Sequence, residues 1–196
     1  MSLIEQLADK LTPGEPPSPL DGKRSAAVAV LLHDIHVGGR DVPDDPRVLL
    51  MKRAERIGDP WSGHISLPGG RYEGSDRDLL QTAIRETREE LNIDLAGARL
   101  LGHLAPLHPR TSGPLGIEVT PFVFVTEVAV EPTPGPEALA AFWLPLATAS
   151  SGALDGTYAY PSSHMTFPSW NFEGHVIWGL TWRILGDLLA LVATKP

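Results

Sequence analysis

The spacing of hydrophobic and polar positions along the chain predicts a mixture of strands and helices. Short apolar or alternating runs of strand length occur at residues 26–32, 48–52, 98–104, 118–128 and 142–145. A polar, glycine-containing loop separates the first two runs, so we expect them to pair as antiparallel neighbours. The pattern is compatible with an α/β/α sandwich but does not by itself select that fold.

Three stretches have the apolar periodicity of helices. Residues 1–11 predict a short amphipathic N-terminal helix. A longer helix is expected to begin at a cap on Ser75 or Asp76 and to end near Leu91. The apolar run at residues 175–192 is predicted to form a buried helix near the end of the chain.

Segments rich in proline and glycine, or in aromatic residues without a clear period, separate these elements. Residues 12–22 have the composition of a linker. We therefore expect an N-terminal helix and linker over residues 1–22 and one domain over residues 23–192. The other segments expected to be irregular are 36–46, 54–66, 129–136, a short turn at 137–141, and 150–172.

Composition narrows the class of protein. The 196 residues are 42% hydrophobic, as expected for a globular domain. The absence of cysteine excludes a disulfide framework, a cysteine-based zinc site and a cysteine nucleophile. The net charge of −8 argues against nonspecific binding of nucleic acid. The N-terminus lacks a signal-peptide pattern and the C-terminal apolar run contains charged residues, so we expect a cytoplasmic protein without a membrane span.

The strongest chemical signal is a group of acidic residues on the longer helix. Glu86, Glu89 and Glu90 fall within an arc of about 100° on that helix. Glu86 and Glu90 are like charges four residues apart, which weakens a helix by about 0.2–0.5 kcal/mol. A cost of this kind is expected where function overrides stability. Carboxylate oxygens suit Mg²⁺ or Mn²⁺, and the alternative interpretation is a solvated acidic face.

The sequence around these glutamates resembles the Nudix box, the motif of the Nudix hydrolase family. That motif has a glycine, five residues, an acid, then R-E-x-x-E-E and a glycine. The matching residues are Gly70, Asp76, Arg85, Glu86, Glu89 and Glu90. The chain departs from the motif in having Asp76 instead of glutamate, one extra residue before Arg85, and Asn92 instead of the last glycine. Asparagine also tolerates the left-handed conformation that ends a helix.

The resemblance covers most of the chain and implies a Nudix-type α/β/α sandwich, with a mixed sheet and a loop–helix–loop catalytic box. It implies hydrolysis of a small-molecule nucleoside diphosphate derivative with Mg²⁺ or Mn²⁺. Glu86 and Glu90 would be direct metal ligands, and Glu89 would hold metal through water or act as the base. Arg85 would orient a glutamate. The glycine pair, Gly69 and Gly70, would let the backbone approach metal and phosphates.

Flanking residues are similar to the coenzyme A pyrophosphatase branch of that family. The branch shares the longer box, and its L-L-x-x-R-[SA] motif is matched by VLLMKRA at residues 48–54, followed by Gly63. Two further similar segments are 119–123 and 177–181. Gly58 stands where a second arginine is expected, and Leu67 stands where phenylalanine is expected. The resemblance implies coenzyme A or a derivative as substrate, giving 3′,5′-ADP and phosphopantetheine.

Other charged residues are candidates for roles around the box. Arg53, Arg56 and Arg71 could bind phosphates because guanidinium groups pair with phosphate oxygens. Glu118 and Glu137 are candidates for a further carboxylate outside the box, and the alternative for each is a solvated surface acid.

Alternatives remain for the substrate and for the class of protein. ADP-ribose or a dinucleotide such as NADH is the other enzymatic substrate considered. A non-catalytic binding module is the alternative of another class, and the intact R-E-x-x-E-E argues against it. The tryptophan-rich segment at residues 161–182 is expected to pack in the core or in a homodimer interface.

Overall fold

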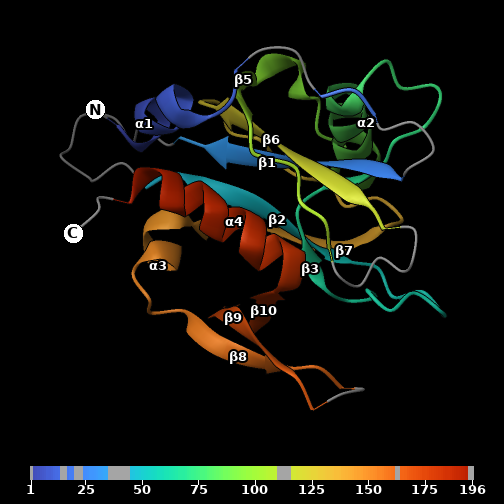
Figure 1. Cartoon of the computed structure of the whole chain (residues 1–196), viewed down its shortest axis with the longest axis vertical. Coiled ribbons are helices and arrows are strands. Elements are labelled where there is room, and N and C mark those ends of the chain that lie inside the picture. The colour runs from blue at the N-terminus through green and yellow to red at the C-terminus, as the bar shows by residue number, and fades with distance from the viewer. Residues whose placement is uncertain are drawn as a thin grey trace.

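A mixed sheet of seven strands forms the centre of the part of the chain that the structure describes (Figure 1). The computed structural model describes residues 2–13, 17–19, 24–34, 45–109, 116–161 and 164–193. The strands are β1 Ser25–His33, β2 Arg47–Arg53, β3 Ile65–Ser66, β4 Gly69–Arg71, β5 Arg99–His103, β6 Glu118–Thr126 and β7 Ala138–Pro145. Their order is β3–β2–β1–β6–β5, with β4 also paired to β1 and β7 to β2.

The pairing of the strands confirms much of the pattern expected from the sequence. β1 and β2 are antiparallel, with Leu32 opposite Val48, while β1 and β6 are parallel. The turn predicted at residues 137–141 is confirmed only at Glu137 and is wrong from Ala138, where β7 begins. Its alanine-rich start has little strand preference of its own, and pairing with β2 holds it extended.

Helices cover both faces of the sheet, as the expected α/β/α sandwich requires. Helix α2, Leu79–Leu91, covers one face, where its Leu79 and Ala83 belong to the same buried core as Leu49 and Met51 of β2. Helices α1, Leu3–Lys10, and α4, Gly179–Val192, belong to the core on the other face. The intervening β2 residues Val48 and Leu50 point to that second core, because side chains alternate along a strand.

A second, three-stranded antiparallel sheet lies below the main sheet in Figure 1. It comprises β8 Asp155–Ala159, β9 Thr166–Phe172 and β10 His175–Trp178. The irregular structure predicted over residues 150–172 is therefore wrong for most of that segment, which also includes the end of the short helix α3, Leu146–Ser150. Glu173 and Gly174 both have positive φ, as a tight two-residue hairpin turn between β9 and β10 requires.

The hairpin also corrects the predicted C-terminal helix. Residues 175–178 form β10, and the helix begins only at Gly179, where φ is +64°. Glycine adopts this conformation without steric cost, so the chain can pass directly from strand to helix. The apolar periodicity continues through the strand and hides this boundary in the sequence.

The ends of α2 are set by local hydrogen bonds. Asp78 caps the helix by accepting a hydrogen bond of 2.8 Å from the backbone N–H of Gln81. The cap predicted at Ser75 or Asp76 is therefore wrong by two residues or more. At the other end, Asn92 adopts the left-handed conformation, with φ of 55°, which is the conformation expected for the residue that replaces glycine.

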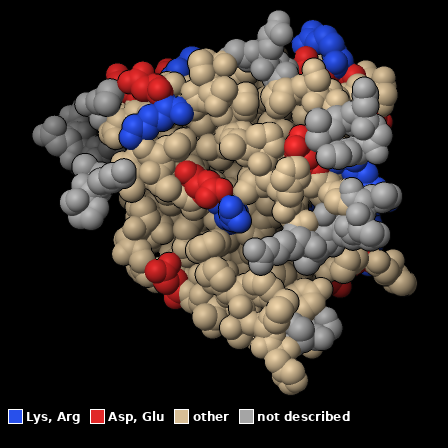
Figure 2. All heavy atoms as spheres, viewed as in Figure 1, with Lys and Arg blue, Asp and Glu red and all other residues tan. Residues whose placement is uncertain are grey.

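Figure 2 shows that the face with α4 in front bears few charged side chains. No described helix has the length and hydrophobicity that a membrane crossing needs. The predicted loop at residues 36–46 falls almost entirely outside the described residues, as does part of the linker at residues 12–22.

Candidate active site

The three glutamates of the box lie along α2 but differ strongly in exposure. Glu90 is only 1% exposed, whereas the side chains of Glu86 and Glu89 are 15% and 57% exposed. The acidic side of the helix therefore runs from solvent at Glu89 to the covered junction with β4 at Glu90. A wholly solvated acidic face does not describe this helix.

The glycine pair brings β4 against two of these carboxylates. The backbone N–H of Gly69 donates a hydrogen bond of 2.9 Å to Oε2 of Glu90. A Cβ on Gly69 would stand 2.3 Å from the carbonyl oxygen of Ala27, and φ is +151° there. A Cβ on Gly70 would stand 2.3 Å from Oε1 of Glu86. A larger residue at Gly69 would push β4 away from β1, and one at Gly70 would displace the carboxylate of Glu86.

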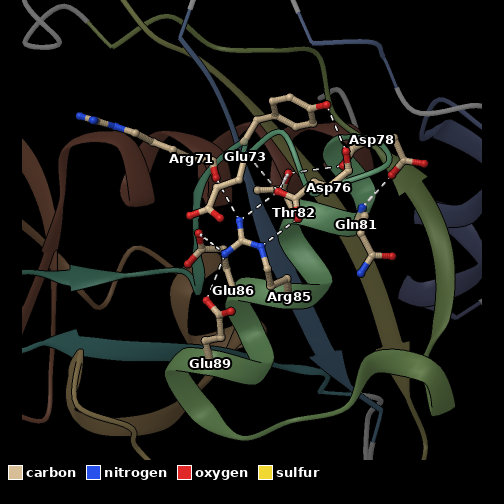
Figure 3. A network of polar contacts seen from close by, with 10 residues as sticks. Arg71, Glu73, Asp76, Asp78, Gln81, Thr82, Arg85, Glu86 and Glu89 are labelled. Carbon is tan, nitrogen blue, oxygen red and sulfur yellow. Dashed lines mark hydrogen bonds and ion pairs between the residues drawn. The ribbon is translucent and has the colours of Figure 1, made fainter.

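Arg85 is the centre of the polar network around the box (Figure 3). Its Nε and one terminal nitrogen donate to the two carboxylate oxygens of Asp76, at 2.9 and 3.0 Å. The other terminal nitrogen donates to Glu86 and to Glu89, at 3.0 Å each. One guanidinium group thus fixes two of the box glutamates and is itself fixed by Asp76.

Asp76 is buried and fully supported by its neighbours. It accepts hydrogen bonds from the hydroxyl of Thr82 at 2.8 Å and from the backbone N–H of Glu73 at 3.1 Å. The hydrogen bonds from Arg85 hold the pKa of Asp76 at about 2, against the opposing effect of burial. The pKa of Arg85 is raised, chiefly by the same interaction, so the pair stays ionised.

The less exposed box glutamates hold their protons more tightly than ordinary carboxyl groups. Burial raises the pKa of Glu90 to about 8, although the N–H of Gly69 opposes this rise. Burial also raises the pKa of Glu86, and the charge of Arg85 opposes it. The negative charge of Glu137 adds to the rise at both positions. A cation placed between these groups would favour their ionised forms.

The structure brings three of the other candidate residues to this site. The Arg53 charge lowers the pKa of Glu90, and a terminal nitrogen of Arg53 donates to Asp59 at 3.0 Å. Arg56 forms an ion pair of 3.0 Å with Glu137. The end of β2 and the loop that follows it therefore present two guanidinium groups near the box, each paired with an acid.

Two candidates lie elsewhere or act through the backbone. Glu118 begins β6, where its Oε2 lies 3.4 Å from Nε2 of His108. The side chain of Arg71 points away from the network in Figure 3. Its carbonyl oxygen instead accepts a hydrogen bond of 3.1 Å from Arg85.

Sequence reasoning did not identify the residues that support Arg85 and Arg53. The box spacing marks Asp76 as a motif residue, but only the fold shows that it pairs with Arg85 nine positions away. Thr82 is one helical turn before Glu86 and carries no sign of its contact with Asp76. Asp59 lies in a loop without periodicity, so no pattern could pair it with Arg53.

The residues present fit a divalent cation whose coordination would be completed by the substrate. Within the described residues, no three histidine or acidic side chains are grouped closely enough to form a ready-made metal site. Mg²⁺ is commonly held by one or two carboxylates together with water and substrate phosphates. Glu86 and Glu90, both beside the glycine pair, have hard carboxylate oxygens that could serve as ligands of that kind.

Comparison with known proteins identifies the family to which this geometry is related. The family described as NUDIX domain matches residues 23–163. A relative from Yersinia pestis (strain Pestoides F), described as the uncharacterized Nudix hydrolase NudL, is 32% identical over 154 residues. That match covers 76% of this chain and 74% of the relative.

Solved structures show the same fold at low sequence identity. The Nudix hydrolase RenU from M. smegmatis superposes with a TM-score of 0.57 at 13% identity, covering 89% of this chain and 90% of that one. A NUDIX hydrolase from Alicyclobacillus acidocaldarius gives a TM-score of 0.56 at 20% identity, covering 90% and 94%. These two likenesses concern the arrangement of the sheet and helices.

Proposed function

We propose that this chain, which belongs to the Nudix family and is a Nudix hydrolase, acts on coenzyme A or a derivative of it. Cleavage of the diphosphate would give 3′,5′-ADP and phosphopantetheine. The observation that carries the proposed site is the contact of Glu86 and Glu90 with the glycine pair. The choice of coenzyme A is supported by the VLLMKRA motif, Gly63 and the longer box.

In the proposed reaction, the oxygen of a water molecule forms a bond to one phosphorus while the bond from that phosphorus to the bridging oxygen breaks. The water gives up a proton to a carboxylate. A divalent cation, when bound, would neutralise phosphate charge and make the water more acidic. Glu86 and Glu90 would hold that cation. Glu89, the most exposed of the three, would bind it through water or accept the proton.

The arginines would act on the substrate and on the glutamates in different ways. Arg85 orients Glu86 and Glu89 through its two hydrogen bonds. Arg53 and Arg56 would bind the diphosphate, exchanging their present acidic partners for phosphate oxygens. Release of Arg56 would free Glu137, which then becomes a second candidate for the base.

Two alternatives stay open beside coenzyme A. ADP-ribose or a dinucleotide such as NADH would use the same carboxylates and arginines, because the reacting diphosphate is the same. A non-catalytic binding module is disfavoured because all three box glutamates are present.

A panel of substrates tests the proposal. Coenzyme A, 3′-dephospho-coenzyme A, ADP-ribose and NADH would be incubated with Mg²⁺ or Mn²⁺, and the products identified by phosphorus NMR. We expect the highest kcat/KM for coenzyme A, with 3′,5′-ADP as a product. A much higher kcat/KM for ADP-ribose would reject coenzyme A as the substrate, and turnover of none of the four would reject diphosphate hydrolysis.

A further inference from the structure

A half-buried pocket of about 210 Å³ opens on the sheet face opposite α2. Its lining includes a cation, two imidazoles and two larger aromatic rings, from Lys52, His64, Tyr158, His175 and Trp178. Alternate residues of β2 belong to the core that includes α2 and to the core that includes α4, and this alternation puts Lys52 on the α4 face. Figure 1 shows β8 and β10, which supply Tyr158, His175 and Trp178, well away from α2.

The rings of this pocket are held in place by one another. Tyr158 and Trp178 stack with centroids 4.1 Å apart, and His64 meets Trp178 edge-on at 5.2 Å. Phe142, which does not line the pocket, stacks on His175 at 4.4 Å. Rings fixed in this way lose little conformational freedom when they bind a flat ligand. Because burial lowers the pKa of His64, its neutral ring offers one hydrogen-bond donor and one acceptor.

Lys52 gives the pocket a cation that the described residues leave without an ion pair. Its side chain passes over Gly63, with Cε 4.0 Å from the point where a Cβ would stand. Oε1 of Glu55 lies 3.8 Å from that same point, so one acid is nearby without forming a salt bridge. A half-buried lysine in this position favours a ligand that carries negative charge.

The pocket adjoins the proposed diphosphate site through Arg53. The backbone N–H of Arg53 donates to the carbonyl oxygen of His64 at 3.0 Å. The charge of Arg53 also acts on both His64 and Glu90. At about 210 Å³ the pocket is smaller than the range of about 300–1,000 Å³ typical of whole ligands. It therefore suits one part of a substrate whose diphosphate lies at Arg53.

We propose that this pocket binds the base and the sugar phosphate of a nucleotide, with the base against Tyr158 and Trp178 and the phosphate at Lys52. The inference rests on the proposed function for the position of the diphosphate. It names the substrate class as a nucleoside diphosphate derivative with an additional phosphate on its sugar. ADP-ribose and NADH lack that phosphate and would leave Lys52 without a partner.

Calorimetric binding of the isolated nucleotide part tests the pocket without catalysis. Adenosine 3′,5′-bisphosphate should bind the wild type more tightly than adenosine 5′-monophosphate, and Lys52→Met should weaken its binding about tenfold, the effect of one charge-assisted contact. The same substitution should change the binding of the monophosphate little. Arg47→Met is the matched control, because Arg47 is an exposed cation at the opposite end of the same strand. Equal effects of the two substitutions would overturn the proposal.

The aromatic part of the pocket has its own control. Tyr158→Leu should weaken the binding of both nucleotides by roughly tenfold, since stacking of a base contributes about 1–3 kcal/mol. Phe167 is the cross-strand partner of Tyr158 and contacts Trp178 at 5.6 Å, but does not line the pocket. Phe167→Leu should therefore leave nucleotide binding unchanged. If it weakens binding as much as Tyr158→Leu, the rings serve packing and the proposal fails.

Turnover separates failure of the pocket from failure of the proposed function. If coenzyme A is hydrolysed but Lys52→Met leaves its KM unchanged, the pocket is rejected and the proposed function stands. If no diphosphate is hydrolysed but the bisphosphate binds in a Lys52-dependent way, the proposed function fails and the pocket stands. Should Tyr158→Leu fail to fold, the comparison of Lys52→Met with Arg47→Met still decides.

Discussion

Glu90 combines burial with a place beside the glycine pair, which allows a direct test of its role. Its pKa of about 8 means that the carboxyl group is largely protonated near pH 7 in the metal-free protein. Glu90→Gln is then close to an isosteric change and should leave the fold and its stability nearly intact. Loss of a ligand charge should still lower kcat by two orders of magnitude or more, about 3 kcal/mol.

Steady-state kinetics with coenzyme A and Mg²⁺, together with circular dichroism, would measure these two effects. Glu86→Gln should behave in the same way. Glu131→Gln is a matched control, because Glu131 is an exposed acid outside the site, and it should retain wild-type turnover. Full activity in both Glu86→Gln and Glu90→Gln would show that the box is not part of the active site.

Asp76 should make folding stability depend on pH in the acidic range. Its folded pKa is about 2, below the unfolded value of about 3.9. Its interaction with Arg85 therefore stabilises the fold above about pH 4 and is lost as pH falls toward 2. Asp76→Asn should lower the free energy of unfolding by about 2 kcal/mol at pH 7, and by much less near pH 2.

Urea unfolding of wild type and Asp76→Asn at pH 7, 4 and 2.5 measures this difference. Asp9→Asn, at an exposed position of α1, should change the free energy of unfolding little at any of these pH values. A difference between wild type and Asp76→Asn that stays constant from pH 7 to 2.5 would show that ionisation of Asp76 does not stabilise the fold.

Because β4 lies against α2, alanine substitutions at Gly70 and Gly74 should have unequal effects on turnover. Gly70→Ala would place a methyl group 2.3 Å from Oε1 of Glu86, so the carboxylate must leave its place beside Arg85. We expect kcat to fall at least tenfold, about 1.4 kcal/mol, with a small change in melting temperature. Gly74→Ala is the control, because nothing lies within 4 Å of its added Cβ. Equal turnover in the two variants would contradict the importance of this junction.

Local sequence patterns predict the elements better than the contacts between them. Strand alternation and helical periodicity are local properties, so β1, β2 and α2 could be expected from the sequence. The strand β10 could not, because its boundary depends on backbone conformations at Gly174 and Gly179 that apolar periodicity does not reveal. The motif supplied the glutamates of the site, whereas Asp76–Arg85 and Arg56–Glu137 pair only through the fold.

At the scale of the whole molecule, the sheet separates two kinds of chemistry. The α2 face presents the box carboxylates, and the α4 face presents the pocket with Lys52 and the stacked rings. The chain has a net charge of −8, so its field repels a polyphosphate in general. Local cations at residues 52, 53 and 56, together with a bound divalent ion, would offset that field at one end of the sheet.

Binding of that ion should link the stability of the whole chain to pH. Because the pKa of Glu90 is raised from 4.5 to about 8, the native state keeps a proton that the unfolded chain releases as pH rises between these values. Metal-free stability should therefore fall over this interval. Mg²⁺ displaces the proton and should stabilise the fold more at pH 8 than at pH 6. At a hundredfold excess over Kd, the gain is about 2.7 kcal/mol, or roughly 5–10 °C in Tm.

Differential scanning fluorimetry with and without Mg²⁺ at pH 6 and 8 tests this linkage in wild type, Glu86→Gln and Glu90→Gln. Both variants should show a smaller metal-induced rise in Tm, since each lacks one ligand charge. Glu90→Gln should also lose most of the difference between the two pH values, because an amide does not titrate. A metal-induced rise that is the same in all three proteins would show that the cation binds elsewhere. In that case the only role of the contact between Glu90 and Gly69 would be to stabilise the fold. The assignment of Glu86 and Glu90 as ligands would then be wrong.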